Sequence, residues 1–177
     1  MTRWAGVLMA GTMLVLVSVP GWGAEERTVK ASAAWVGEGR FFATGTETLY
    51  FVGAFSGILF VDNDQGLLNT AKILCPGTLE VEVNGSAQRG EGRCVMTDHD
   101  GNHVFARWTC AGTHQVECKG TFTLTGGTGR FSGITGQSEF RVRTAIAELA
   151  IGQHMGEGIR ETSAGIAEWP TLRYRIP

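Results

Sequence analysis

The chain has 177 residues, of which 26 are glycine and only 4 are proline, and its formal net charge at pH 7 is −2. The 15 basic residues are scattered and form no patch of the kind that binds nucleic acid, so nucleic acid is not an expected partner. Without its first 23 residues the chain has about 150 residues, the length of a single domain.

Residues 1–23 have the layout of a secretory signal peptide. A single early charge, Arg3, precedes the apolar run 5–19, and Gly21 and Gly23 occupy the small-residue positions before a cleavage site at Ala24. The run is shorter than the roughly 20 residues that a membrane-spanning helix needs. We therefore expect cleavage, no stable membrane span afterwards, and a single periplasmic or secreted domain over residues 24–177.

Alternation of apolar and polar residues with period two dominates the rest of the chain and predicts strands. It is clearest at residues 79–83, 139–144 and 172–176, where each strand would have one face in water. The more continuously apolar residues 48–61 predict a long strand that bends at its internal glycines. Residues 144–151 fit either a short helix or a continued strand. The glycine-rich residues 152–165 predict an irregular loop.

The four cysteines predict two disulfides, because an even count in an exported chain favours pairing. Asn84-Gly85 predicts a two-residue hairpin, and counting outward from it brings Cys75 opposite Cys94. The other two cysteines flank a second hairpin end. A zinc site is the alternative, but no Cys-x-x-Cys spacing is present. The expected pairs are Cys75–Cys94 and Cys110–Cys118.

Two acidic clusters, residues 62–66 and 98–102, were compared with metal sites. The second lacks the spacing of an EF-hand loop, because its glycine is fourth and Thr109 is twelfth. Both clusters fit hairpin turns better. His99 and His103 have no third ligand nearby in the sequence. We expect neither a metal nor another cofactor.

The segment 126–136 is the most informative part of the chain, with five glycines among eleven residues between two predicted strands. It is not a phosphate loop, because no lysine follows and the next residues alternate with period two. Glycines at this density serve tight turns and close backbone approaches. The five are Gly126, Gly127, Gly129, Gly133 and Gly136.

The order Gly-Gly-Thr-Gly-basic-Phe in this segment resembles the glycine segment of the allene oxide cyclase and dirigent-like β-barrels. The Asp100-Gly101 hairpin looks like the turn before it in bacterial members of that superfamily. The resemblance covers residues 95–142, under a third of the chain. It implies a bacterial exported protein with an all-β fold. That fold is a single antiparallel barrel of about eight strands with at most one short helix, which the strand spacing also favours.

Family members either cyclise a fatty-acid epoxide or hold phenolic radicals in an apolar barrel, without a cofactor. None of their catalytic residues aligns with a position here, so the catalytic residues are unknown. Strand-borne ionisable candidates exist, although each residue type is more often a solvated side chain. They are Glu47, Tyr50, Arg107, Glu117, Glu139 and Arg141.

Three functions follow from these observations. One is a barrel that binds a small hydrophobic molecule in its interior, against a lining expected to include Phe51, Phe55, Phe122 and Phe140. The second is a cofactor-free isomerase or cyclase of the allene oxide cyclase type, and the third is an accessory or structural subunit of an envelope complex. No nucleophile motif is present. Catalysis would need a buried ionisable group with a shifted pKa, and because the sequence guarantees none, binding or assembly is favoured over catalysis. Homo-oligomerisation stays open.

Overall fold

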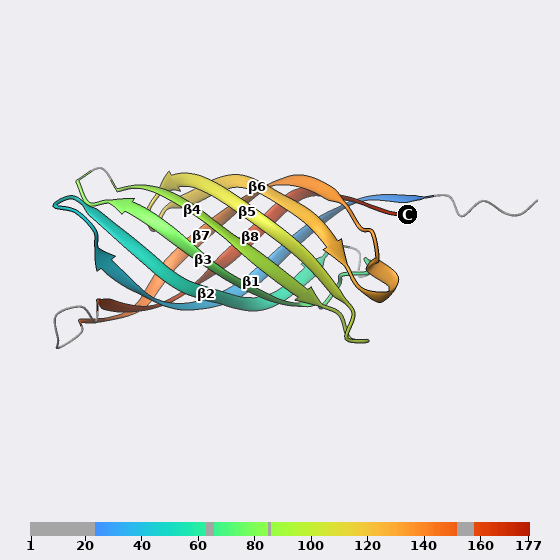
Figure 1. Ribbon diagram of the computed structural model, residues 1–177, viewed down its shortest axis with the longest axis horizontal. Coiled ribbons are helices and arrows are strands. Elements are labelled where there is room, and N and C mark those ends of the chain that lie inside the picture. Colours follow the sequence, from blue (N-terminus) through green and yellow to red (C-terminus); the bar gives the residue numbers. More distant parts are fainter. Residues whose placement is uncertain (1–23, 63–65, 85, 152–157) are drawn as a thin grey trace, which may run out of the picture.

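The computed structural model describes residues 24–62, 66–84, 86–151 and 158–177, with the side chains of 146–151 left out, so the expected signal peptide lies outside it. In that part of the chain, eight antiparallel strands form a closed barrel in chain order (Figure 1). The strands are β1 (Glu25–Ala43), β2 (Thr48–Val61), β3 (Lys72–Glu82), β4 (Ala87–Thr97), β5 (His103–Thr113), β6 (Glu117–Gly127), β7 (Gly136–Ile151) and β8 (Ile159–Ile176).

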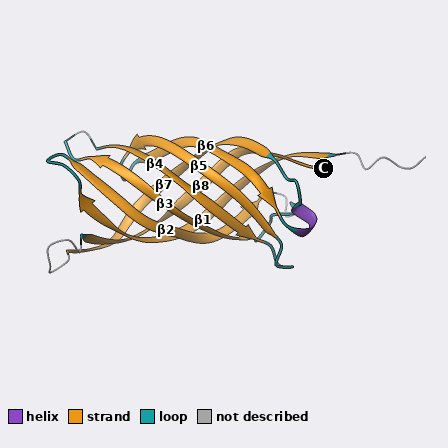
Figure 2. Ribbon diagram, viewed as in Figure 1, coloured by secondary structure: helices purple, strands orange, loops and turns teal. Residues whose placement is uncertain are grey.

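The all-β prediction is confirmed. The single helical element within the described residues is a 3-10 turn, η1 (Gly129–Phe131), which stands out in Figure 2. Residues 144–151 continue strand β7 and are not a helix. The expected loop 152–165 is wrong from Ile159 onward, because β8 finds partners on both sides: Gly165 pairs with Trp35 of β1 and with Thr144 of β7. Residues 152–157 lie outside the described part.

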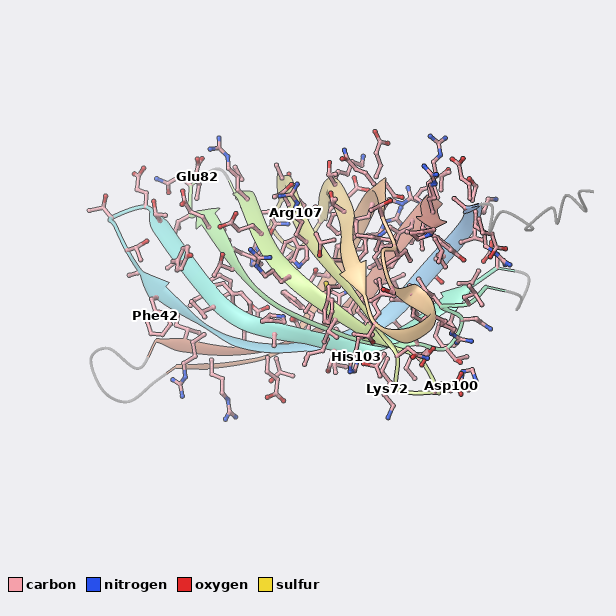
Figure 3. The ribbon with its side chains drawn as sticks, turned by 45° about the vertical axis from the view of Figure 1, so that its right-hand side comes forward. Phe42, Lys72, Glu82, Asp100, His103 and Arg107 are labelled. Carbon is pink, nitrogen blue, oxygen red and sulfur yellow. A yellow bond between two sulfur atoms is a disulfide. The ribbon has the colours of Figure 1, made fainter. Side chains whose placement is uncertain are left out.

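The barrel has two distinct ends. The turns of the β1–β2, β3–β4 and β5–β6 hairpins meet at the end that we call the hairpin end (Figure 1). The other end, which we call the capped end, carries the start of β1, the end of β8, the 98–102 turn and η1. Figure 3 shows Phe42 and Glu82 toward the hairpin end and Lys72, His103 and Asp100 toward the capped end.

The glycine segment covers the capped end. Phe131 of η1 and Ile134 just after it are both 0% exposed, and they belong to the main apolar core. Gly129 has a φ of 54°. The φ of Gly127 is not in the left-handed region, but a Cβ there would lie 2.7 Å from the carbonyl oxygen of His103. The segment thus combines a left-handed turn with a close backbone approach.

The acidic 98–102 turn is tied to the glycine segment through Asp98. Its carboxylate accepts hydrogen bonds from the backbone N–H groups of Asp100 (2.9 Å) and Asn102 (2.8 Å). It also pairs with Arg130 at 2.7 Å. Burial opposes ionisation of Asp98, but hydrogen bonds from the side-chain amide and the backbone N–H of Asn102, together with Arg130, outweigh it and lower the pKa of the carboxyl.

Two disulfides lie inside the barrel, between Cys75 and Cys94 and between Cys110 and Cys118, and they are the pairs expected from the sequence. Val81 pairs with Gln88 and Leu74 with Val95, which is the register that the Asn84-Gly85 hairpin predicts. Two disulfides are typical of a protein that folds outside the reducing cytosol. Among the described residues, no helix is long and apolar enough to cross a membrane.

A row of inward glycines makes room for the aromatic rings of the barrel interior. Gly39, Gly53, Gly77 and Gly92 are successive cross-strand neighbours on β1 to β4. A Cβ at Gly77 would lie 2.5 Å from the ring of Trp108, and one at Gly92 would lie 2.6 Å from its Nε1. From the sequence, Gly53 was expected only as a point where the strand bends. In the structure it is also part of the inner surface against which the large aromatic rings pack.

Candidate functional site

The barrel interior holds a cavity of about 90 Å³. Its lining is mostly aromatic, and the rings contact one another edge to face: Trp35 and Phe55 have centroids 5.1 Å apart, as do Phe122 and Trp169. Both disulfides also line it. The four phenylalanines expected to face inward, Phe51, Phe55, Phe122 and Phe140, all lie on this wall. That they bind a ligand stays a prediction.

A group of apolar side chains packs between strands near the turns of the hairpin end. Phe41, Phe51 and Val81 form a second buried cluster there, and each is at most 5% exposed. The rings of Phe41 and Phe51 have centroids 5.1 Å apart. Phe41 also packs edge-on against the imidazole of His114 at 5.6 Å.

Four polar side chains interrupt the aromatic lining near the hairpin end: Gln88, His114, Glu161 and Ser163. The Nδ1 of His114 lies 3.1 Å from Oε1 of Gln88. Because an amide oxygen only accepts hydrogen bonds, this contact requires a proton on Nδ1. Burial lowers the pKa of His114, so the neutral ring is favoured.

Glu161 is the buried carboxyl group of this cluster, with 4% of the residue exposed. Burial raises the pKa of Glu161, and a hydrogen bond with Ser163 offsets only part of that effect. Its Oε2 atom is buried and has no hydrogen-bond partner among the described residues. The group is therefore a buried acid that is easily protonated and has hydrogen-bonding capacity to spare.

Two indole N–H groups on the same wall are, like Oε2 of Glu161, buried without a hydrogen-bond partner among the described residues. The Nε1 atoms of Trp35 and Trp169 are buried and, within the described part of the chain, have no acceptor. Both residues line the cavity. Since most buried polar groups in proteins are hydrogen-bonded, three unpartnered atoms around one cavity make it the candidate site.

The ionisable candidates from the sequence are not brought together at the cavity. Glu47, Arg107 and Glu139 are exposed, whereas Tyr50, Glu117 and Arg141 are partly exposed. None of the six is on the cavity lining. Two of them form surface ion pairs instead, Glu117 with Lys119 and Arg141 with Glu168, each at 2.8 Å.

Sequence reasoning missed Glu161 because residues 152–165 were expected to form an irregular loop. A bulge in β8 would also have shifted the phase of any strand counted back from its C-terminal part. Leu172 and Tyr174 point inward, and counting back from them in steps of two would turn Glu161 and Trp169 outward. The pairing shifts between Val29–Leu172 and Ala31–Trp169, so two residues of β8, Pro170 and Thr171, lie opposite one residue of β1. Proline is common at such bulges, and Pro170 is the signal that could have revealed the shift.

No group of three or more His, Cys, Asp or Glu side chains within the described residues could hold a metal ion. The carboxylate of Asp98 is occupied by its own turn and by Arg130. The 98–102 turn is therefore a structural feature of the capped end, and the cavity is the candidate site.

No protein-family model matches the sequence, and no curated protein matches it significantly. Among solved structures, the chain is similar to the pterocarpan synthase dirigent protein GePTS1. The two share 9% sequence identity and a TM-score of 0.44, over 96% of this chain and 100% of the other. Because both values are low, the barrel is assigned from its own strand pairing.

Proposed function

We propose that the protein is an exported barrel that binds a small, largely apolar molecule in its interior cavity. The observation that supports this function is the aromatic cavity itself, in which three tryptophans and four phenylalanines surround about 90 Å³ of space. Transfer of an apolar molecule from water into such a space is favourable. Export rests on the expected signal peptide of residues 1–23 and on the two disulfides.

The cavity volume limits the occupant. It is smaller than the roughly 150 Å³ of an engineered cavity that holds benzene. With the Phe41–Phe51 ring pair in place, only a compact molecule, or a compact part of a longer one, fits. Rotation of Phe41 away from Phe51 would open the hairpin end for entry and exit.

Xenon binding tests this proposal directly. We expect xenon to shift the NMR resonances of Phe55, Trp108 and Trp169 in the mature protein. Ala33 lines the cavity and is 1% exposed, so Ala33→Leu should fill the space and abolish the shifts. Ala31→Leu is the matched control, since Ala31 is buried on the same strand but is not on the lining.

Absence of xenon-dependent shifts in the wild type would overturn the proposal, as would shifts that persist unchanged in a folded Ala33→Leu protein. If that variant does not fold, Ala167→Val makes a smaller addition to the same wall. Thermal melting of each variant shows whether it is folded.

Glu161 favours a second candidate, the cofactor-free isomerase or cyclase. An acid whose pKa is raised and a histidine whose pKa is lowered line one apolar cavity, which is the arrangement that proton transfer needs. Native mass spectrometry of protein from its own host identifies a retained molecule. If the wild type converts that molecule and Glu161→Gln does not, the protein is an enzyme; if both retain it unchanged, it is a binding protein. The accessory-subunit alternative stays a prediction.

A further inference from the structure

We infer that the cavity is built for a compact neutral carbonyl compound, whose oxygen accepts a hydrogen bond from an indole N–H of Trp35 or Trp169. This inference rests on the proposed binding function and names its ligand class. Its basis is the set of unpartnered buried atoms on the lining, which consists of two indole nitrogens and one carboxyl oxygen.

Most of these unpartnered buried atoms are hydrogen-bond donors. An indole N–H can only donate, so each tryptophan needs an acceptor. Trp35 is 7% exposed and Trp169 is 2% exposed, so bulk water does not supply one. A carbonyl oxygen accepts up to two hydrogen bonds and brings no donor of its own. A hydrocarbon of the same shape would leave the indole unpaired, at the cost that any buried polar group carries.

Charge on the lining excludes ionised ligands. None of the described lining residues is Lys or Arg, and the titratable side chains among them are Glu161 and His114. An anion would find no cationic partner in an apolar space, and it would face the carboxyl of Glu161. A cation carries no hydrogen-bond acceptor, so it would leave the indole N–H groups of Trp35 and Trp169 unpaired. A neutral ligand meets neither penalty.

The unpartnered atoms are spread along one wall formed by β1 and β8. The ring of Trp35 lies over Gly165, where a Cβ would come within 2.5 Å of it. Glu161 is four residues from Gly165 toward the hairpin end, about 13 Å along the strand. Trp169 is four residues away in the other direction and stacks on Phe140 at 6.1 Å. A compact molecule therefore meets one indole at a time.

Acetone and isobutene provide a matched test, because they share one branched skeleton and differ in C=O against C=CH₂. We expect acetone to move the indole N–H resonance of Trp35 or Trp169 downfield in the ¹⁵N spectrum, and isobutene to cause no such shift. Replacement of the responding tryptophan by Phe should weaken acetone binding about fivefold more than isobutene binding, because one neutral hydrogen bond is lost only for acetone.

Trp108→Phe is the control. Trp108 lines the same cavity, but its nitrogen is not among the unpartnered buried atoms. This variant should therefore change the binding of both probes to a similar degree. Acetate and isopropylammonium, charged molecules of the same branched shape, should not bind.

The outcomes separate this inference from the proposed function. If neither acetone nor isobutene binds, the binding function itself fails. If isobutene binds and acetone leaves both indole resonances in place, ordered water satisfies the indoles and the carbonyl inference is wrong, while the binding function stands. Equal weakening of both probes by the Trp→Phe variant, or binding of acetate, also overturns the inference. The indole N–H resonances of the wild type with acetone and with isobutene test the carbonyl inference even where a variant does not fold.

Discussion

Among the side chains that the structure describes, two carboxyl groups are buried, and their surroundings are opposite. Asp98, at the capped end, receives two backbone N–H groups and Arg130, and its pKa is lowered. Glu161, on the cavity wall, has the hydroxyl of Ser163 beside it and a free Oε2, and its pKa is raised. The first carboxyl completes a piece of structure, whereas the second leaves hydrogen-bonding capacity at a cavity.

The packing is close beside Asp98 and leaves a space beside Glu161. Beside Asp98, the glycine segment inserts Phe131 and Ile134, which are 0% exposed, into the core. Beside Glu161, large rings meet edge to face and leave about 90 Å³ of space. The comparison indicates that the capped end secures the fold, whereas the cavity has the features that the proposed binding function needs.

Truncation of one phenylalanine in each region is expected to have the largest effect. Phe131→Ala should lower the free energy of unfolding by about 4 kcal/mol, the usual cost for a fully buried Phe, without changing xenon binding. Phe55→Ala should cost less, about 2–3 kcal/mol, because Phe55 is only partly buried, and it should widen the range of ligands that bind. Urea denaturation measures both costs. Equal costs, or altered binding in Phe131→Ala, would contradict the division between the two regions.

Neutral isosteres test the two carboxyl groups themselves. Asp98→Asn should lower the free energy of unfolding at pH 8 by about 2 kcal/mol, because hydrogen bonds to a charged acceptor are lost. Glu161→Gln should stay within about 0.5 kcal/mol of the wild type or be more stable, since it removes a buried group that ionises with difficulty. A Glu161→Gln protein less stable than Asp98→Asn would show that Glu161 has a structural partner.

The pH dependence of stability should have opposite signs for the two groups. Because the pKa of Glu161 is raised in the folded protein, its contribution is fully present below the ordinary value of 4.5 and is lost as pH rises through the folded value. The pKa of Asp98 is lowered, so its contribution is present above 3.8 and is lost as pH falls through the folded value.

The measurement is urea denaturation of wild type and Glu161→Gln from pH 4 to pH 8. The wild type should lose stability relative to the variant as pH rises. His114, whose pKa is lowered from 6.5, loses its contribution as pH falls, but it does so in both proteins and cancels in the difference. A difference that is constant with pH would refute the raised pKa of Glu161.

The smallest effect concerns two glycines of the capped end. Gly101 has a φ of 80° with open space around it, so Gly101→Ala should cost about 1 kcal/mol from backbone strain alone. Gly129 has a φ of 54°, and a Cβ there would also overlap the amide oxygen of Asn102. Gly129→Ala should therefore cost about 1 kcal/mol more than Gly101→Ala. Thermal melting compares the two, and an equal shift would show that Asn102 moves aside freely.

The sequence by itself determined most of the strands and the register of the β3–β4 hairpin, but not the first half of β8. It also led to the expectation, which the cavity lining matches, that Phe51, Phe55, Phe122 and Phe140 lie inside. These features depend on period-two alternation and on turn residues a few positions apart, which are local in the chain. Both cysteine pairs are joined across neighbouring strands of single hairpins, so they too follow from local register.

Only the tertiary structure decided the polar part of the cavity. The bulge at Pro170 and Thr171 reverses which residues of β8 face inward, and it is defined only when β8 pairs with β1 to close the barrel. His114 meets Phe41 and Gln88 because three different hairpins end at the same rim. Whether the polar atoms of Glu161, Trp35 and Trp169 have a hydrogen-bond partner depends on all the strands around them. The burial of a polar atom is a property of the closed barrel, and no local sequence pattern encodes it.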